Sequence, residues 1–240
     1  MTRPGLFVVG TDTGVGKTFV SSAIARTWTM AGHRVGVLKP LSSGAEVIDG
    51  ELCSPDAAQL IEAVGGGVPH HRVAPIIFEE PLAPNVAARL RGISLHRGEI
   101  ERLVFDAINW WEAQAEVMVV EGVGGFLCPI AEGMTVADLA VMLDYPVLIV
   151  AHRGLGTLNH TLLTVEAASS RSLRIAGVIL NGTKPPTDPM AEATNAVELS
   201  RWLGRIAILA DWEYRPGSVT HQVAPEAGNW YDLTRPSRRP

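Results

Sequence analysis

The sequence predicts an α/β fold built on a doubly wound, mainly parallel sheet with helices on both faces. Short apolar runs rich in β-branched residues recur along the chain, and segments with helical patterns separate them. The runs are continuous rather than alternating, which is typical of parallel strands that are covered on both faces. Strands that alternate with helices in this way favour right-handed crossovers, and therefore a doubly wound sheet.

The expected elements follow one another without a break in composition. The strands are expected at Leu6–Val9, Val35–Leu38, Val117–Val120, Val147–Val150, Ile175–Leu180 and Ile206–Leu209. The helices are expected at Lys17–Ala31, Glu99–Ala113, Thr157–Ser169 and Met190–Leu203. We expect one domain over residues 1–240, with about 234–240 as a flexible tail. Ligands of such sheets bind beyond the carboxyl ends of the strands, so the polar and glycine-rich residues that follow the apolar runs are the candidate site.

The overall composition excludes several classes of function. The 240 residues carry a formal net charge of −5, whereas non-specific nucleic-acid binding needs a basic face. No apolar run reaches the roughly 18 residues that cross a membrane, and no basic-then-apolar leader precedes the first strand. Cys53 and Cys128 lack CxxC spacing and are expected to be ordinary cytosolic thiols, with one disulfide as the alternative. We therefore expect a cytoplasmic protein without nucleic-acid or membrane partners.

The segment "GTDTGVGKT", from Gly10 to Thr18, has the ingredients of a phosphate-binding loop. Glycines between a strand and a helix let backbone N–H groups point into one concavity, and the helix N-terminus adds a partial positive charge. Lys17 would reach the β- and γ-phosphates, and Thr18 would bind Mg²⁺. The usual first glycine is replaced by Thr11, and Gly10 stands one position too early. The alternative is a tight turn with an exposed lysine, but the whole pattern favours a P-loop NTPase-like site.

Residues at other strand ends complete the candidate site. The chain has only three lysines, and Lys39 directly follows the second expected strand, where it would face the γ-phosphoryl group or an anionic acceptor. Glu121 follows the strand Val117–Val120 and supplies a carboxylate for Mg²⁺. Asp56 in "CSPDAAQL" is either a second metal carboxylate or a helix-start residue.

The motifs "GTDTGVGKT", "KPLSSG", "SPDAAQL", "EEPLAPNVAA", "VEGVGG", "GLGTLNHTLLT" and "GVILNG" occur in this order. With them the chain resembles the dethiobiotin synthetase family from about Phe7 to Asn181. The longer phosphate loop is typical of that family. The resemblance implies an ATP-dependent cyclo-ligase of biotin biosynthesis that converts 7,8-diaminononanoate, CO2 and MgATP to dethiobiotin, ADP and phosphate. It also implies a carbamate, a carbamic–phosphoric anhydride and a homodimer.

The resemblance implies roles for individual residues of this chain. Lys39, with Lys17, is the catalytic group that holds the γ-phosphate and the carbamate. The metal residues are Thr18, Asp56 and Glu121. The nucleotide-binding residues are Gly14, Val15, Gly16, Lys17, Thr18, Phe19, Asp56, Glu121, Gly122, Val123, Gly124, Asn181, Gly182, Ala207, Ile208 and Leu209, and Asn181 reads the adenine edge. The substrate residues are Thr13, Ser43, Gly154, Leu155, Gly156, Thr157 and Asn159, and the last five bind the substrate carboxylate across the dimer interface.

Some features depart from the family or leave alternatives open. Some relatives have glutamate where this chain has Gly14, and a proline often stands where it has Ala207. Arg153 offers a purely ionic alternative for the substrate carboxylate, and "GLGTLNH" read without the family is also compatible with a simple turn and helix cap. Amidase relatives need an additional glutaminase-like domain, for which 240 residues leave no space. A ParA/MinD-like ATPase switch would carry a lysine early in the loop, and none is present at Thr11–Thr13.

Overall fold

The centre of the molecule is a six-stranded parallel sheet. The computed structural model describes residues 4–216 and 230–234. In the order β12-β11-β10-β1-β7-β2, every neighbouring pair of strands is parallel. The strands are β1 (Gly5–Gly10), β2 (Val35–Leu38), β7 (Val117–Gly125), β10 (Val147–His152), β11 (Ile175–Asn181) and β12 (Ile208–Trp212). The chain passes to one side of β1 to form β2 and to the other side to form β10, so the loop after β1 lies at the topological switch point.

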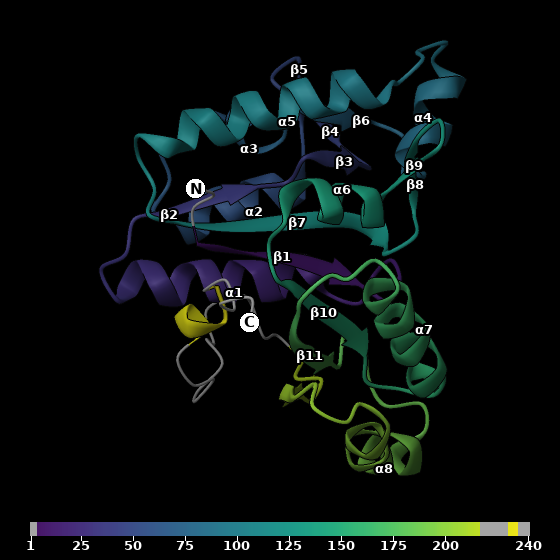
Figure 1. Cartoon of the computed structure of the whole chain (residues 1–240). Coiled ribbons are helices and arrows are strands. Elements are labelled where there is room, and N and C mark those ends of the chain that lie inside the picture. Colours follow the sequence, from purple (N-terminus) through teal and green to yellow (C-terminus); the bar gives the residue numbers. More distant parts are fainter. Residues whose placement is uncertain (1–3, 217–229, 235–240) are drawn as a thin grey trace.

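Helices cover both sides of this sheet, as the continuous apolar strands require. They are α1 (Lys17–Met30), α2 (Pro55–Ala63), α3 (His70–Val73), α4 (Pro84–Leu90), α5 (Arg97–Glu112), α6 (Val136–Leu143), α7 (Thr157–Ser169), α8 (Pro189–Trp202) and the 3₁₀ helix η1 (Trp230–Thr234). Figure 1 shows α1 and α6 on opposite sides of β1 and β7. The predicted doubly wound α/β fold is confirmed.

Short strand pairs extend the carboxyl edge of the sheet, where the candidate site was expected. They are β3 (Leu41–Ser43) with β6 (Ile76–Phe78), β4 (Glu46–Ile48) with β5 (Glu51–Cys53), and β8 (Pro129–Ala131) with β9 (Met134–Thr135). The β3 strand follows β2 almost directly, so it carries the chain from Lys39 to Ser43. These pairs therefore place the residues after β2 next to the end of the sheet.

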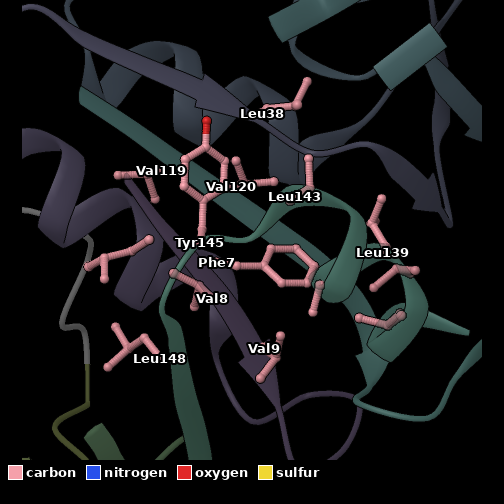
Figure 2. Packing of buried hydrophobic residues seen from close by; sticks show 14 of the residues in the cluster. Phe7, Val8, Val9, Leu38, Val119, Val120, Leu139, Leu143, Tyr145 and Leu148 are labelled. Carbon is pink, nitrogen blue, oxygen red and sulfur yellow. The ribbon is translucent and has the colours of Figure 1, made fainter. Parts of the chain in front are cut away.

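The core includes all of β1, because this strand has neighbours on both edges and helices on both faces. All four residues of Leu6–Val9 are fully buried. The ring of Phe7 points toward Leu139 and Leu143 of α6, as Figure 2 shows. Packing on β1 therefore fixes the strand from which the glycine-rich loop leaves the sheet.

Replacing Phe7 tests this role of the core. Phe7→Ala should lower the free energy of unfolding by about 3–5 kcal/mol, since it removes buried apolar area and leaves a cavity. Phe105→Ala is a matched control, because Phe105 lies on α5 with 42% of its surface exposed. Urea unfolding followed by circular dichroism measures both variants. Similar losses for the two would contradict the central place given to β1.

Three details differ from the sequence-based expectation or add to it. The last strand is β12 (Ile208–Trp212) rather than Ile206–Leu209, because the Ile206 N–H still donates to Leu203 O (3.0 Å) in the turn that ends α8. Helix α6 was not predicted, although its capping box, Thr135 with Asp138, is a sequence signal. Of the expected tail, Thr234 ends η1 and is buried, and residues 235–240 lie outside the described part of the chain.

Two further expectations can be compared with the structure. Cys53 and Cys128 are both free thiols, as predicted. Within residues 4–216 and 230–234, no helix is long and apolar enough to cross a membrane.

Candidate active site

The glycine-rich loop joins β1 to α1 and turns back toward the sheet. Strand β1 ends at Gly10, and α1 begins at Lys17 after Gly16 as its N-cap. The Lys17 ammonium reaches back across the loop and donates to the carbonyl oxygen of Asp12 at 3.0 Å. The loop therefore adopts the strand–turn–helix arrangement that a phosphate cradle requires.

At Gly16 the fold depends on the absence of a side chain. Its φ of 88° lies in the left-handed region, and a Cβ there would come within 2.1 Å of the Asn181 amide nitrogen. That nitrogen donates to Val15 O at 2.9 Å. Asn181, at the end of β11, thus braces the loop directly. Gly14, where some relatives carry glutamate, has a φ of 74° and open space around it.

The environment of Lys17 suits a bound anion. Burial, followed by the positive charge of Lys39, lowers the pKa of Lys17 to about 8. A group whose charged form is disfavoured in this way is stabilised by a negative charge placed beside it. Phosphate oxygens in the loop would supply that charge.

Lys39 is held between two carboxylates that come from distant parts of the sequence. It is 2% exposed, and its ammonium lies 2.5 Å from Glu121 Oε1 and 2.9 Å from Asp56 Oδ2. It also donates to the carbonyl oxygen of Gly122 at 3.1 Å. A buried lysine is tolerated only with such partners. Lys39 is therefore not a solvated surface lysine at the end of β2.

The charges of this cluster support one another. Burial acts to lower the pKa of Lys39, but the carboxylates of Glu121 and Asp56 outweigh it and raise the pKa. Burial likewise acts to raise the pKa of Asp56, but Lys39 outweighs it and lowers the pKa. The cluster therefore holds a cationic Lys39 and an anionic Asp56 at neutral pH.

Asp56 reaches the site because of how α2 begins. Ser54 caps this helix by accepting from the Ala57 N–H at 3.2 Å, and Pro55 occupies its first turn. Asp56 is thus a helix-start residue and a site carboxylate at once. The helix-start interpretation is confirmed. The metal-carboxylate interpretation stays a prediction.

The residues present fit a magnesium ion. The Thr18 hydroxyl lies 2.8 Å from Glu121 Oε1 and 2.9 Å from Asp56 Oδ1, so the three predicted metal residues converge. Glu121 is fully buried, and its Oε2 has no hydrogen-bond partner among the described residues. No group of three or more acidic, histidine or cysteine side chains forms a metal cluster in that part of the chain. The hydroxyl of Thr18 and the carboxylates of Asp56 and Glu121 instead suit Mg²⁺, which proteins commonly hold with one or two carboxylates while substrate phosphates supply further ligands.

A cavity of about 400 Å³ lies over this cluster. Several predicted residues line it: Thr13, Gly14, Gly16, Lys17, Thr18, Lys39, Ser43, Asp56, Glu121, Val123 and Gly124. Four residues without a predicted role also line it: Pro81, Leu82, Ala83 and Cys128. The first three belong to the "EEPLAP" motif, which was the available signal.

The turn before α7 lies outside this cavity. None of the five residues from this turn that were assigned to substrate lines the cavity of their own chain. Gly156 is the left-handed N-cap, and no side chain in the described residues caps the helix. Arg153 is engaged with three carboxylates: Glu192 (2.9 Å), Asp211 (2.6 Å) and Glu213 (3.4 Å). It is therefore not available as an ionic partner for the substrate carboxylate.

The structure separates Ala207–Leu209 from the loop. Ile208 pairs with Val178, near the start of β11, whereas Trp212 pairs with Asn181 at its end. The Trp212 ring contacts Phe19 edge-on at 5.7 Å between ring centres. The residues of β12 beside the nucleotide loop are therefore those around Trp212, three or more positions beyond the segment that the family resemblance implied.

Known proteins resemble this chain over most of its length. A family model described as an AAA domain matches residues 4–220. The chain is 46% identical over 212 residues to the ATP-dependent dethiobiotin synthetase BioD of Anaeromyxobacter dehalogenans (strain 2CP-C), covering 87% of this chain and 90% of that protein. The enzyme of the same name from Anaeromyxobacter sp. (strain Fw109-5) is 44% identical over 201 residues, or 84% and 86% of the two chains.

Solved structures support the fold alone. The signal recognition particle receptor FtsY from Elizabethkingia anophelis aligns with a TM-score of 0.53 at 13% identity, covering 98% of this chain and 66% of that chain. The cell division protein ftsY from Thermotoga maritima aligns with a TM-score of 0.53 at 16% identity, covering 97% and 68%. Both are similar to this chain in architecture.

Proposed function

The chain belongs to the ATP-dependent dethiobiotin synthetase family and is thus an ATP-dependent cyclo-ligase of biotin biosynthesis, and on that premise we propose how its residues carry out the reaction. The substrates are 7,8-diaminononanoate, CO2 and ATP. One amine takes up CO2 as a carbamate, and a carbamate oxygen attacks the γ-phosphorus and displaces ADP. The second amine then attacks the carbonyl carbon of the resulting anhydride, closes the ring and releases phosphate. The observation that supports this best is the buried Lys39 held over the phosphate loop by two carboxylates.

Lys17 and Lys39 contact different anionic groups of the substrates. Lys17 contacts the phosphates in the loop and stabilises them in the ground state. Lys39, fixed at the end of β2, faces the reacting oxygen and stabilises the charge that develops during phosphoryl transfer. Ser43 and Thr13 line the same cavity and hydrogen-bond the diamine or its carbamate. This arrangement positions the carbamate in line with the γ-phosphate.

Thr18, Asp56 and Glu121 would hold Mg²⁺ beside these phosphates. The bound ion would supply positive charge that neutralises the transferred phosphoryl group. Lys39 keeps a hydrogen-bonding partner during the reaction, because its ammonium donates to the carbonyl oxygen of Gly122 at 3.1 Å. Asn181 retains a carbonyl oxygen and a second amide hydrogen for the adenine edge, beyond the one that it donates to Val15.

The reaction itself is tested by the fate of an oxygen atom. With ¹⁸O-labelled bicarbonate and short reaction times, dethiobiotin should form and the released phosphate should carry one labelled oxygen, since the attacking carbamate oxygen leaves with the phosphate. Mass spectrometry measures both products, and a reaction without the diamine is the control. Dethiobiotin accompanied by unlabelled phosphate would exclude the anhydride.

The active site is shared between two subunits of a homodimer. The substrate carboxylate is remote from its amines, and the α7 turn that would bind it lies outside the cavity of its own chain. Free N–H groups and the dipole of α7 suit an anion there. Leu155 and Leu163 expose 76% and 56% of their surface and provide apolar area for a partner.

The two free thiols further support a reducing, cytoplasmic location.

Mixing two inactive variants tests the shared site. Asn159→Asp should prevent binding of the substrate carboxylate by charge repulsion, while its charge in the first turn of α7 favours the helix. Lys39→Ala inactivates the other half of the site. After equal amounts of the two variants exchange subunits, about a quarter of wild-type activity should return, because half of the dimers carry one intact site. No recovery after verified exchange would place each site within one chain.

A further inference from the structure

Arg153 forms a polar network that the reaction scheme does not use. It directly follows β10, and its guanidinium contacts carboxylates from two other elements, Glu192 of α8 and Asp211 of β12, as well as Glu213 beyond β12. Its side chain is 12% exposed and that of Glu192 is 7% exposed. Three carboxylates around one largely buried arginine are more than charge balance requires. A planar guanidinium can bind several such groups in fixed directions.

The network connects the strand ends on the nucleotide side of the sheet. The backbone N–H of Arg153 donates to the backbone oxygen of Asn181 (3.2 Å). The side-chain amide of Asn181 in turn donates to Val15 O in the phosphate loop. Side chains alternate along a strand, so Asp211 and Glu213 face Arg153 while Trp212 faces Phe19 on the other side. Strand β12 lies at an edge of the sheet, and β11 separates it from β10. Arg153 extends past the end of β11 to Asp211 of β12, and it thereby holds the strand end around Trp212 that borders the nucleotide loop.

The same residue borders the turn that precedes α7. The Asn195 side chain of α8 donates to the carbonyl oxygens of Arg153 (2.9 Å) and Gly154 (3.1 Å). Glu192, one turn earlier on α8, binds the Arg153 guanidinium. Helix α8 therefore contacts both the guanidinium and the backbone carbonyl of Arg153. These two contacts fix the direction in which the turn before α7 leaves the sheet.

We propose that Arg153 is a positioning residue that keeps the nucleotide edge around Trp212 and the substrate-binding turn at Gly154–Thr157 in a fixed relative arrangement. It touches neither the phosphates nor the reacting atoms. Its loss should weaken the binding of both substrates and leave the chemical step, which depends on Lys17 and Lys39, nearly intact. The part that concerns the diamine rests on the function proposed above.

The test separates binding from catalysis and from folding. In Arg153→Ala we expect the dissociation constant for Mg–ADP, measured by calorimetry, and the KM for diaminononanoate both to rise by about 2- to 30-fold. The kcat should change little. Arg153→Lys should recover part of both losses, because the lysine ammonium keeps the charge but lacks the planar fork of donors with which the guanidinium reaches all three carboxylates. Arg201→Ala is the matched control, since Arg201 lies on α8 and pairs only with Glu198 among the described residues.

A second variant allows for a folding defect. Arg153→Ala leaves Glu192 buried without its partner, which can destabilise the chain. The double variant Arg153→Met with Glu192→Gln removes both charges, and it should show the same two binding losses with a melting temperature closer to the wild type. An unchanged ADP constant or an unchanged diamine KM in a folded variant would overturn the proposal. If the wild type made no dethiobiotin, the proposed function would fail, while the ADP measurement would still test the nucleotide half.

Discussion

Lys39→Ala should abolish dethiobiotin formation while leaving most of the affinity for ADP. In the proposed mechanism Lys39 acts on the carbamate and on charge that develops in the transition state, so its removal should lower kcat by a factor of about 10²–10³ or more. Lys17→Ala should also inactivate the enzyme but should clearly weaken ADP binding, because in the proposed mechanism Lys17 contacts phosphates that are already present in the ground state. Calorimetry with ADP and with a non-hydrolysable ATP analogue, together with single-turnover kinetics, distinguishes the two.

The third lysine of the chain provides the matched control. Lys184 is exposed and lies beyond the end of β11, so Lys184→Ala removes the same charge outside the cavity. It should retain wild-type turnover and nucleotide affinity. Near-full activity of Lys39→Ala would show that its burial between two carboxylates serves the fold rather than the reaction. Equal losses of ADP affinity in the Lys17 and Lys39 variants would contradict the division of roles.

Glu121→Gln should raise the apparent Mg²⁺ requirement by about tenfold or more and should lower turnover. The substitution keeps the shape of the side chain but removes the charge from an Oε2 atom that has no partner in the described residues. The same charge balances Lys39, so the melting temperature should also fall, although Asp56 remains at 2.9 Å to keep the lysine paired. Mg²⁺ titrations at saturating ATP measure the first effect.

The control for this charge is Glu132→Gln, because Glu132 is an exposed carboxylate between β8 and β9. Its Mg²⁺ titration should match that of the wild type. An unchanged titration in Glu121→Gln would assign Glu121 to the pairing of Lys39 alone. A higher Mg²⁺ requirement with an unaltered melting temperature would instead show that Asp56 suffices to hold the lysine.

The geometry of the lysine cluster bears on how the metal and the lysine work together. Lys39 and Thr18 both approach Glu121 Oε1, at 2.5 and 2.8 Å, while Oε2 has no hydrogen-bond partner within residues 4–216 and 230–234. One carboxylate can therefore serve the lysine with one oxygen and a cation with the other. In the proposed mechanism this sharing would place two positive charges beside the γ-phosphate without leaving either of them buried and unpaired.

Much of the nucleotide site is encoded locally. The apolar run at Leu6–Val9 is continuous because both faces of β1 are buried, and the glycines after it mark a turn that only glycine adopts at Gly16. Local patterns of this kind, together with the helix that follows at Lys17, carry their own structural signal. They predicted the strands of the central sheet and the position of the phosphate loop. The bounds of the last strand were wrong, because β12 begins two residues later than expected.

Contacts between residues far apart in the chain were decided only by the tertiary structure. Lys39 and Glu121 are 82 positions apart, and they meet because β2 and β7 are neighbours in the sheet, an order that no local pattern specifies. The engagement of Arg153 by Glu192, Asp211 and Glu213 could not be predicted either, since it depends on where α8 and β12 pack. The sequence by itself determined which chemical groups are available at the strand ends. The strand order, set by long-range packing, decided which of those groups are free to meet a ligand and which are used to hold one another.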